Sequence, residues 1–336
     1  MNDDTLVTVR NLKTFFYTNG RCNKAVNDVS FSIKKGKTLC VVGESGCGKS
    51  VTAASIMQLL PTLARIESGE IRYHGPAGEV RIEALERNGK EMRALRGADI
   101  AMIFQDPMTA LNPVYTVGFQ IQENLQYHRA MDSGERRRKT LSLLADMGIP
   151  IPEQRIDEYP HQFSGGMRQR AMIAMAMACD PKVLIADEPT TALDVTTQAQ
   201  VFSLMNGLKE KYGTAIMLIS HDMGVVTELA DDVIVMYMGN IVEGGSVDDV
   251  LRWPTHPYTA ALLRSIPILG KGKRQKLNPI RGATPDPHDR PKGCQFAPRC
   301  DFRTELCDEK MPDERYIGPT HRLRCWHRGK GTADGK

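Results

Sequence analysis

The chain has 336 residues, of which 41% are hydrophobic and 25% are charged, and its formal net charge is +4. This composition is typical of a soluble globular protein with material for one large domain and an appendage. No apolar run approaches the ~20 residues that a membrane-spanning helix needs, and the acidic, polar start is unlike a secretory signal, so membrane-spanning and secreted proteins are excluded. We expect a cytosolic protein.

The basic charge is concentrated in residues 271–336, which contain 16 Lys and Arg against 9 Asp and Glu. A nucleic-acid-binding arm is one interpretation of such a segment. The two signs of charge are interspersed, however, and there is no dense Lys/Arg block, which favours a solvated appendage. We therefore expect no nucleic-acid partner.

The first elements expected are strands. Residues 5–9 and 26–33 alternate apolar and polar side chains, as half-buried antiparallel strands do, and the continuous apolar run at 38–42 is typical of a buried parallel strand. Residues 49–60 have helical spacing and end before Pro61, which disfavours helix in the residue before it.

A mostly helical stretch at about 107–165 interrupts the strands and predicts a helical insertion. After it, helices and buried strands alternate, which indicates an α/β sheet with crossover helices. The expected elements are a helix at about 165–179, a strand at 182–187, a helix at 194–212, and strands at 215–220 and 232–238. Past about residue 270 the chain becomes rich in Pro, Gly and charge, which marks a domain boundary.

Residues 43–50, GESGCGKS, match the phosphate-binding pattern GxxxxGK[ST] between an expected strand and an expected helix. In that context backbone NH groups and the helix N-terminus cradle the phosphates, Lys49 reaches the β- and γ-phosphates, and Ser50 ligates Mg²⁺. A chance glycine-rich turn is disfavoured because strand, loop, helix and motif coincide. The expected ATP contacts here are Gly43, Ser45, Gly46, Cys47, Gly48, Lys49, Ser50 and Val51.

A metal ligand and a base should follow a buried strand, and VLIADE at 183–188 supplies both. Asp187 is expected to bind Mg²⁺, and Glu188 to polarise the attacking water. An acidic pair at a strand end is by itself more often a cap or a turn. The phosphate loop upstream favours the catalytic interpretation.

Residues 163–170, FSGGMRQR, lie between these two elements and resemble the LSGGQ signature of ABC transporter nucleotide-binding subunits. Ser164, Gly165 and Gly166 are intact, whereas Phe163 and Met167 replace the terminal Leu and Gln. Two glycines after a serine open a helix whose NH groups can meet a γ-phosphate. The resemblance implies that two subunits sandwich two nucleotides, so this signature would serve the partner's ATP.

The resemblance also assigns roles to residues in the segments IFQDP, TALD and LISHD. It implies that Gln105 senses Mg²⁺ and the attacking water, that Asp194 links the two subunits, and that His221 contacts the γ-phosphate. A histidine after an apolar strand is otherwise more often structural. An aromatic residue near the N-terminus should stack on adenine; Phe16 is the first candidate and Tyr17 the alternative, although both could instead pack within a strand.

Within this family the chain resembles the importers of dipeptides and oligopeptides. The resemblance rests on GESGCGKSVTAASIM, IAMIFQDPMTALNP, YPHQFSGGMRQR, HPYTAALL and the tail PKGCQFAPRC…C…HRLRCW, so it spans nearly the whole chain. It implies a peripheral ATPase on the cytoplasmic face of the inner (plasma) membrane, paired with a second, homologous ATPase subunit as a heterodimer. Two membrane permeases and an external substrate-binding protein complete the expected assembly, and glutathione, nickel chelates or oligosaccharides are alternative cargoes.

The segment IFQDPMTALNP suits a surface loop because Pro107 and Pro113 forbid a regular helix. Its apolar side chains Met108, Leu111 and Val114 are expected to receive a permease helix. Packing in the core is the alternative explanation.

Four cysteines, Cys294, Cys300, Cys307 and Cys325, crowd the end of the chain with the spacing CX5CX6CX17C. In a reducing cytosol, clustered cysteines more often bind metal than form disulfides, and four thiolates suit iron and sulfur. The pattern is similar to that of peptide-importer subunits with a [4Fe-4S] cluster, which implies these four ligands. A Zn²⁺ site is the alternative.

These observations predict an α/β fold with a P-loop NTPase core and parallel sheet, an N-terminal antiparallel β subdomain, a helical insertion and a small Cys-rich C-terminal extension. The nucleotide-binding domain would span residues 1–270, with its helical subdomain at about 107–165, and the extension would span 271–336. The expected function is ATP hydrolysis that drives peptide import. A soluble ABC ATPase of DNA repair or translation and a P-loop kinase are the alternatives; the single signature, the lack of sustained heptads and His221 disfavour them.

Overall fold

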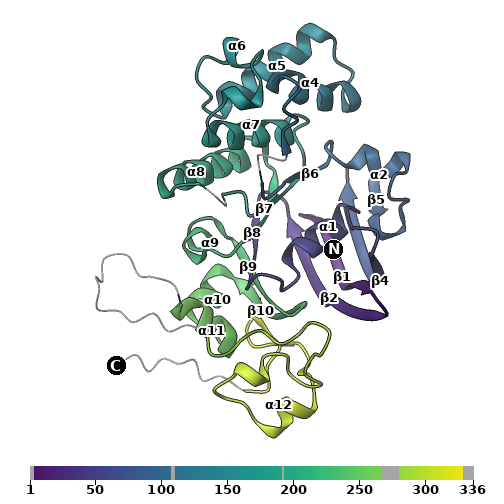
Figure 1. Cartoon of the computed structure of the whole chain (residues 1–336), viewed down its shortest axis with the longest axis vertical. Coiled ribbons are helices and arrows are strands. Elements are labelled where there is room, and N and C mark those ends of the chain that lie inside the picture. The colour runs from purple at the N-terminus through teal and green to yellow at the C-terminus, as the bar shows by residue number, and fades with distance from the viewer. Residues whose placement is uncertain (1–3, 107–109, 191–192, 266–279, 328–336) are drawn as a thin grey trace. The chain divides into compact units, whose positions relative to one another are not determined.

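A computed structural model describes residues 4–106, 110–190, 193–265 and 280–327 (Figure 1). The chain divides into two compact units. The first unit comprises residues 1–7, 32–38 and 72–219, and the second comprises residues 8–31, 39–71 and 220–336. Residues 280–327 therefore belong to the same unit as the phosphate loop, while the expected boundary at 270 lies outside the described residues.

The N-terminal strands form a four-stranded sheet with the order β2-β1-β4-β5. Its strands are β1 Thr5–Thr18, β2 Arg21–Lys34, β4 Ala64–Gly75 and β5 Gly78–Arg81. β1 and β2 are longer than expected and are separated by Asn19 and Gly20 alone, both with positive φ. Such a two-residue turn matches the twist of an antiparallel hairpin.

In the second unit, β3 Thr38–Val42 pairs in parallel with β9 Asp232–Tyr237, and β9 pairs antiparallel with β10 Asn240–Ser246. Two short strands from the C-terminal segment extend this sheet, since β12 Arg322–Leu323 pairs with β10 and β11 Arg315–Tyr316 pairs with β12. The helical elements of this unit are α1 Lys49–Ile56, α9 Met223–Leu229, α10 Val247–Arg252, α11 Pro257–Arg264, η4 Ala297–Arg299 and α12 Glu305–Glu309.

In the first unit, β6 Ile100–Ile103, β7 Val183–Asp187 and β8 Ala215–Ser220 are parallel neighbours. β7 and β8 are buried at every residue, as their uninterrupted apolar runs predict. The helical elements of this unit are η1 Ile82–Ala84, α2 Lys90–Leu95, α4 Val117–His128, α5 Ser133–Asp146, α6 Pro152–Arg155, η2 Pro160–Gln162, α7 Gly165–Met177 and α8 Val195–Tyr212.

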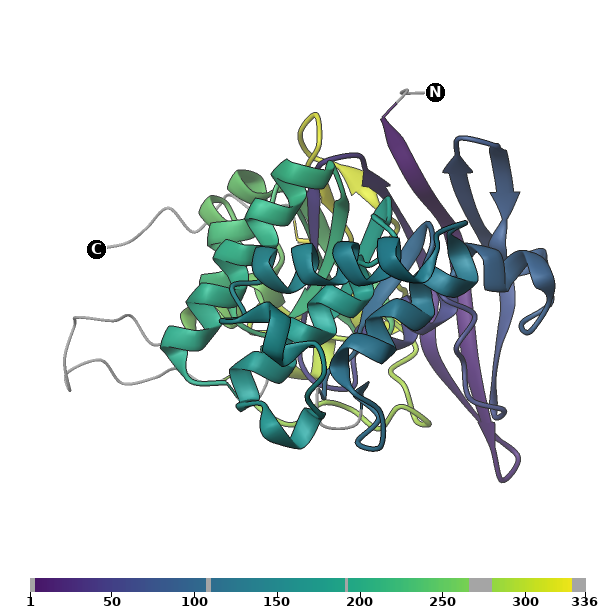
Figure 2. The ribbon, with the colours of Figure 1, turned by 90° about the horizontal axis from the view of Figure 1, so that it is seen from above.

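The helices α4 and α5 lie in the expected helical insertion at about 107–165, and they pack against each other and against α7, which follows it (Figures 1 and 2). Their contact faces bury leucines, isoleucines and methionines, among them Ile121, Leu125, Leu143, Leu144 and Met172. α5 begins with a capping box, in which Asp132 and Glu135 satisfy each other's backbone NH groups. The insertion thus has an apolar core of its own.

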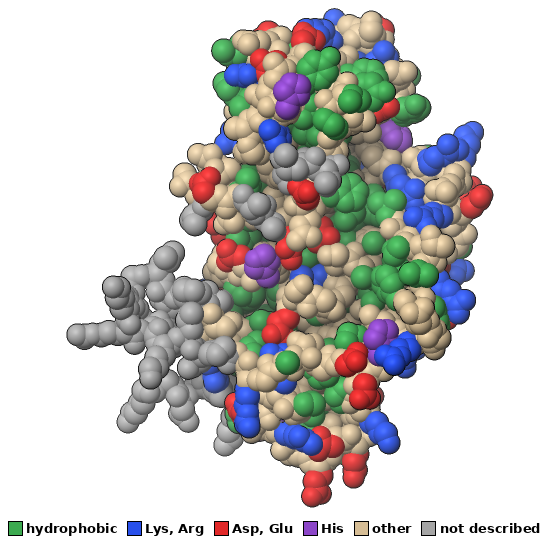
Figure 3. All heavy atoms as spheres, viewed as in Figure 1, with side chains coloured by type: hydrophobic (Ala, Val, Ile, Leu, Met, Phe, Trp, Pro, Cys, Tyr) green, Lys and Arg blue, Asp and Glu red, His purple; other side chains and the backbone are tan. Residues whose placement is uncertain are grey.

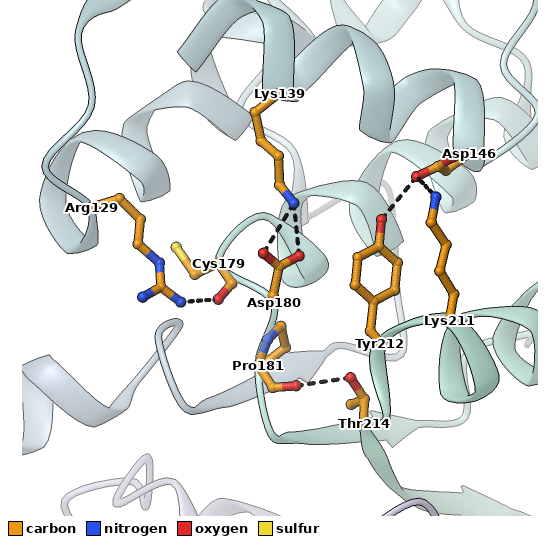
Figure 4. Close-up of polar contacts among 9 residues, drawn as sticks. All are labelled: Arg129, Lys139, Asp146, Cys179, Asp180, Pro181, Lys211, Tyr212 and Thr214. Carbon is orange, nitrogen blue, oxygen red and sulfur yellow. Dashed lines mark hydrogen bonds and ion pairs between the residues drawn. The ribbon is translucent and has the colours of Figure 1, made fainter. Parts of the chain in front are cut away.

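Polar contacts fasten α5 to the start of β7 and to the end of α8 (Figure 4). Lys139 in α5 donates to Asp180, just before β7, at 2.8 Å. At the other end of α5, Asp146 accepts from Lys211 at 2.6 Å and from Tyr212 at 2.8 Å. These contacts tie the insertion to the strand whose end carries the predicted catalytic carboxylates.

The α/β fold predicted from the sequence is confirmed, together with its N-terminal sheet and helical insertion. β8 has the expected bounds, whereas α1 ends at Ile56 rather than residue 60, because Gln58 adopts a left-handed φ of 51°. The elements between residues 64 and 103 were not predicted, since their apolar runs are short. In the described part of the chain, no helix combines the length and apolarity required to cross a bilayer.

Candidate active site

The phosphate loop connects the buried strand β3 to α1 and lies against the backbone of β2 and β9. Gly43 has a φ of 149°, and a Cβ there would lie 2.3 Å from the carbonyl oxygen of Met236 in β9. Gly48 has a φ of 106°, and its Cβ would lie 2.2 Å from the oxygen of Ala25 in β2. Both motif glycines are therefore required by the conformation and by the close backbone approach.

The side chains of the loop divide between the interior and the solvent. Ser45, Gly46 and Ser50 are exposed, as phosphate contact requires, whereas Lys49 is buried. The Nζ atom of Lys49 donates to the carbonyl oxygens of Gly43 at 2.7 Å and Glu44 at 3.1 Å. The ammonium group is therefore held over the loop.

Two further predicted contacts flank these residues. Cys47 is buried beneath the loop, and burial raises the pKa of its thiol, so it is a packed neutral side chain rather than a nucleophile. Its backbone NH donates to the oxygen of Glu44 at 3.3 Å and closes the turn. Val51 lies in the first turn of α1 and is half-buried.

The two aromatic candidates for adenine stacking point to opposite faces of β1, because side chains alternate along a strand. Phe16 shares a face with Thr14, whose hydroxyl lies 2.9 Å from that of Ser55 in α1. Tyr17, on the other face, donates to Glu67 at 2.7 Å, and its ring is covered by Arg65 at 4.6 Å. Phe16 therefore lies on the face of β1 that meets the helix of the phosphate loop.

The predicted catalytic carboxylates lie at the end of β7 in the first unit. Asp187 is the last, buried residue of the strand, and Glu188 follows it with a left-handed φ of 47°. This conformation costs a non-glycine residue about 1–2 kcal/mol and is maintained by a 3.0 Å hydrogen bond from the NH of Glu188 to the oxygen of Ile219. It turns the carboxylate of Glu188 toward Gln105, whose Nε2 donates to Oε2 at 3.1 Å.

The signature residues form the start of α7. Ser164 is the N-cap, and its hydroxyl accepts from the NH of Met167 at 3.3 Å, while Phe163 is buried and anchors the turn. Among the described residues outside this turn, no atom lies within 4 Å of where a Cβ of Gly165 would be, so the space beside this glycine is open. A Cβ on Gly166 would lie 3.1 Å from Thr197 in α8.

Asp194 caps the neighbouring helix α8 and brings its turn beside the signature. Its two oxygens accept from the NH of Thr197 at 3.0 Å and from the hydroxyl of Thr197 at 2.7 Å. These hydrogen bonds lower the pKa of Asp194 and keep it ionised. Ser164, Gly165 and Asp194 are therefore exposed in the first unit, and Gly166 beside them is partly exposed, as a subunit interface requires.

His221 belongs to the second unit and follows β8 directly. Its side chain is exposed, and the next residue, Asp222, caps α9 by accepting from the NH of Gly224 at 2.8 Å. The histidine thus stands at the carboxyl end of a parallel strand, the edge at which open α/β sheets bind ligands.

The four C-terminal cysteines lie in the second unit as free thiols. The NH of Cys294 donates to the oxygen of Cys307 at 2.7 Å. Burial raises the pKa of Cys294 to about 11 and that of Cys325 to about 12, with charge on the neighbouring thiols acting in the same direction. Among the described residues, however, no group of three or more His, Cys, Asp or Glu side chains is placed to hold a metal ion. The predicted cluster is not confirmed.

The predicted permease-docking loop is only partly exposed. Pro107 and Met108 lie outside the described residues, and Leu111 is buried, so its expected docking role is wrong and it packs in the core. Val114 is exposed, together with aromatic residues that the sequence did not single out: Phe104, Tyr115 and Phe119. The rings of Tyr115 and Phe119 stack with centroids 4.9 Å apart. Hydrophobic side chains also reach the surface over the helical insertion in Figure 3.

Sequence reasoning also missed residues that contact the phosphate loop from far along the chain. Glu44 occupies a variable position of the motif, yet its backbone NH donates to the hydroxyl of Tyr258 at 2.8 Å, and its carboxylate pairs with Arg299. Tyr258 belongs to the HPYTAALL segment, which carried the resemblance but no role. No local signal in the sequence links positions that are more than 200 residues apart.

Comparison with known proteins agrees with this geometry. Residues 26–191 match a family model described as ABC transporter, and residues 242–307 match one described as oligopeptide/dipeptide transporter, C-terminal region. A probable peptide ABC transporter ATP-binding protein from Sinorhizobium fredii is 50% identical, over 96% of this chain and 95% of that relative. The dipeptide transport ATP-binding protein DppD from Bacillus subtilis is 48% identical, with the same coverage.

Among solved structures, a dimeric ATP-binding cassette in a post-hydrolysis state, bound to ADP and Pi, is similar with a TM-score of 0.63 and 26% identity. The similarity covers 72% of this chain and 98% of that chain. The two relatives thus match this chain over nearly its whole length. The matched part includes the phosphate loop, the carboxylates at the end of β7 and the signature at α7. The chain belongs to the family of peptide ABC transporter ATP-binding proteins that carry the oligopeptide/dipeptide transporter C-terminal region.

Proposed function

We propose that the chain is the ATP-hydrolysing subunit of an importer of dipeptides or oligopeptides, in which ATP binding and hydrolysis at a dimer interface drive the permeases. Peptides are favoured over glutathione, nickel chelates and oligosaccharides because the relatives at 48–50% identity are named for peptide and dipeptide transport. The observation that carries the hydrolytic part is the contact between Gln105 and Glu188 beside Asp187, at the end of a buried parallel strand.

In this proposal the first unit supplies the groups that act on water. Glu188 accepts a proton from the attacking water, and the amide of Gln105 fixes the orientation of that carboxylate. The strained backbone of Glu188 supports the assignment, because left-handed non-glycine residues concentrate at functional sites. The NH groups of Gly165 and Gly166, in the first turn of α7, would meet the γ-phosphate of the partner's ATP, with Asp194 at the subunit interface.

The second unit supplies the groups that hold the nucleotide. The phosphate loop and Lys49 bind the phosphates, Phe16 stacks on adenine, and His221 contacts the γ-phosphate. Ser50 and Asp187 carry the hard oxygen donors that Mg²⁺ prefers, so they are the residues that would hold it. Bound Mg²⁺ would neutralise charge that develops on the transferred phosphoryl group.

Replacement of Glu188 by glutamine tests the hydrolytic assignment. Glu188→Gln should leave ATP affinity within about twofold and lower ATP turnover about a hundredfold or more, because only water activation is removed. Nucleotide binding to the purified chain and phosphate release by the assembled transporter measure the two effects. Glu210→Gln, at an exposed glutamate of α8, is the matched control. Parental turnover in Glu188→Gln would refute the assignment.

The assembly is proposed by the same argument. Cassettes of this family work as dimers with membrane permeases, and we propose a homologous second ATPase subunit, two permeases, and an external binding protein that delivers cargo to them. The exposed hydrophobic side chains of Phe104, Val114, Tyr115 and Phe119 are the proposed docking site for a permease helix. Docking there would place the chain on the cytoplasmic face of the inner (plasma) membrane.

We also propose that Cys294, Cys300, Cys307 and Cys325 hold a [4Fe-4S] cluster, with Zn²⁺ as the alternative. Support comes from four free, largely buried thiols gathered in one small segment, a donor set that suits either group. Anaerobically purified protein should contain about four iron and four sulfide per chain and absorb visible light. A colourless protein with stoichiometric zinc would establish the alternative, and a chain with neither would remove the site.

A further inference from the structure

Glu44 of the phosphate loop is hydrogen-bonded by two residues from the last third of the chain, Arg299 and Tyr258. The guanidinium of Arg299 forms a bidentate ion pair with the carboxylate of Glu44: Nη1 donates to Oε2 at 2.6 Å, and Nη2 donates to Oε1 at 3.1 Å. Its backbone NH donates to the hydroxyl of Tyr258 at 2.8 Å. Side chain and backbone of this loop residue are thus both held by residues more than 200 positions along the chain.

Arg299 is itself fixed in orientation. Its side chain is only 4% exposed. Nε donates to the oxygen of Arg281 at 3.0 Å, Nη1 lies 3.3 Å from the hydroxyl of Tyr237, and the guanidinium lies 5.9 Å from the ring centroids of Tyr237 and Phe296. Because the guanidinium is planar and its contacts fix its orientation, it holds the carboxylate of Glu44 in one geometry. A lysine ammonium, which lacks this planar pair of donors, could not do so.

Tyr258 is also tied to the C-terminal segment. It lies in the first turn of α11, where Nδ1 of the N-cap His256 accepts from the NH of Tyr258 at 3.1 Å. Glu243 in β10 accepts from the NH groups of Thr255 at 2.8 Å and His256 at 3.1 Å, and it contacts Nε2 of His321 at 2.8 Å. The contacts of Arg299 and Tyr258 with Glu44 therefore both depend on residues that pack with the segment 280–327.

We propose that Arg299 is a positioning residue for the phosphate loop, through which the C-terminal segment sets the affinity of this chain for ATP. The NH groups of the loop bind phosphate only if they converge, and a shift of about 1 Å in such a site can cost up to a hundredfold. Arg299 keeps Glu44, and with it the first turn of the loop, in the binding geometry. This role goes beyond the proposed transport function, since it assigns the segment a part in nucleotide binding.

The test compares two arginines of the same segment. Arg299→Ala should raise the Kd of the full-length chain for MgATP about ten- to a hundredfold. Arg324→Ala is the control, because Arg324 is also a partly buried arginine of this segment but makes its ion pair, at 3.1 Å, with Asp28 in β2 rather than with the loop. Its ATP affinity should stay within about twofold of the parent. In the assembled transporter, Arg299→Ala should raise KM for ATP more than it lowers kcat.

Two further variants separate positioning from folding. Arg299→Lys keeps the charge and should recover part of the lost affinity, because one hydrogen bond can still form. Glu44→Ala should weaken ATP binding about as much as Arg299→Ala, and the double variant no more than either, because the two residues act as one unit. Circular dichroism and melting temperature report whether each variant folds.

Parental ATP affinity in a folded Arg299→Ala or Arg299→Lys chain would overturn the proposal. Equal losses in Arg299→Ala and Arg324→Ala would also overturn it, because the effect would then be one of stability. Failure of the parental chain itself to bind MgATP would contradict the proposed ATPase function instead, so the two failures are distinguishable.

Discussion

Single residues at the nucleotide site are placed by backbone geometry and by strand alternation. Gly43 and Gly48 are needed because a side chain at either position would collide with a carbonyl group of a neighbouring strand. Phe16 and Tyr17 are adjacent, yet alternation sends them to opposite faces of β1, and Tyr17 is already engaged by Glu67 and Arg65. The two candidates for adenine stacking are therefore not equivalent.

This difference predicts unequal effects of two alanine substitutions. Phe16→Ala should raise the Kd for ATP about tenfold, because aromatic stacking on a base contributes about 1–3 kcal/mol. Tyr17→Ala, the matched control, should leave the Kd within about twofold. Fluorescence titration with MgATP measures both, and a larger effect in Tyr17→Ala would reverse the assignment.

At the scale of elements, α11 is connected to the edge of the sheet through one buried carboxylate. Glu243 of β10 is fully buried and contacts the start of α11 and His321. His256 is buried beside it, and burial lowers the pKa of this histidine from 6.5 to about 4, although the charge of Glu243 acts in the opposite direction. The neutral imidazole accepts from the NH of Tyr258 and so caps the helix.

The lowered pKa of His256 predicts that the protein loses stability in mild acid. Below pH 6.5 the unfolded chain binds a proton at this residue that the folded chain does not, so the free energy of unfolding falls until about pH 4. The slope is about 1.4 kcal/mol per pH unit, or about 2 kcal/mol between pH 6.5 and 5. Urea unfolding of the parent and of His256→Asn, which retains a capping oxygen, measures the difference. Identical pH dependence in both would contradict the prediction.

At the scale of the whole molecule, the proposed function divides nucleotide binding between two surfaces of the chain. The phosphate loop belongs to the second unit, whereas Ser164, Gly165 and Asp194 are exposed residues of the first. In the proposed assembly the second surface completes the site of a partner subunit. The phosphate loop of this chain would then be half of a site.

This division predicts that a substitution in the signature lowers ATP turnover of the assembled transporter but does not change ATP binding by the isolated chain. Ser164→Arg should leave the ATP Kd of the isolated chain within about twofold and lower turnover of the assembled transporter at least about tenfold, because the bulky side chain blocks the open end of α7. Ser164→Ala removes the same helix cap, worth about 1 kcal/mol, without the bulk and should retain most activity. Weakened ATP binding by the isolated Ser164→Arg chain would show that the signature acts within the chain.

Much of the fold and most of the candidate site could be predicted because their signals are local. The buried strands β3, β7 and β8 are uninterrupted apolar runs, and the phosphate loop, the Asp187–Glu188 pair and the signature are each defined within a few adjacent residues. Such patterns determine local conformation wherever the segment folds. The strands and helices at 64–103 were missed because neither periodicity extends over enough residues there to be recognised.

The sequence by itself determined the phosphate loop, the carboxylates, the signature and the four-cysteine segment, since each depends on residue types at short spacing. Only the tertiary structure decided which side chains are buried and which meet. Leu111 is buried while Phe104 and Phe119 are exposed, and Gln105 contacts Glu188. The tertiary structure also decided that Arg299 holds Glu44, across 255 positions of the chain. The physical reason is that such contacts are set by how strands and helices pack in space, which no pattern of neighbouring residues specifies.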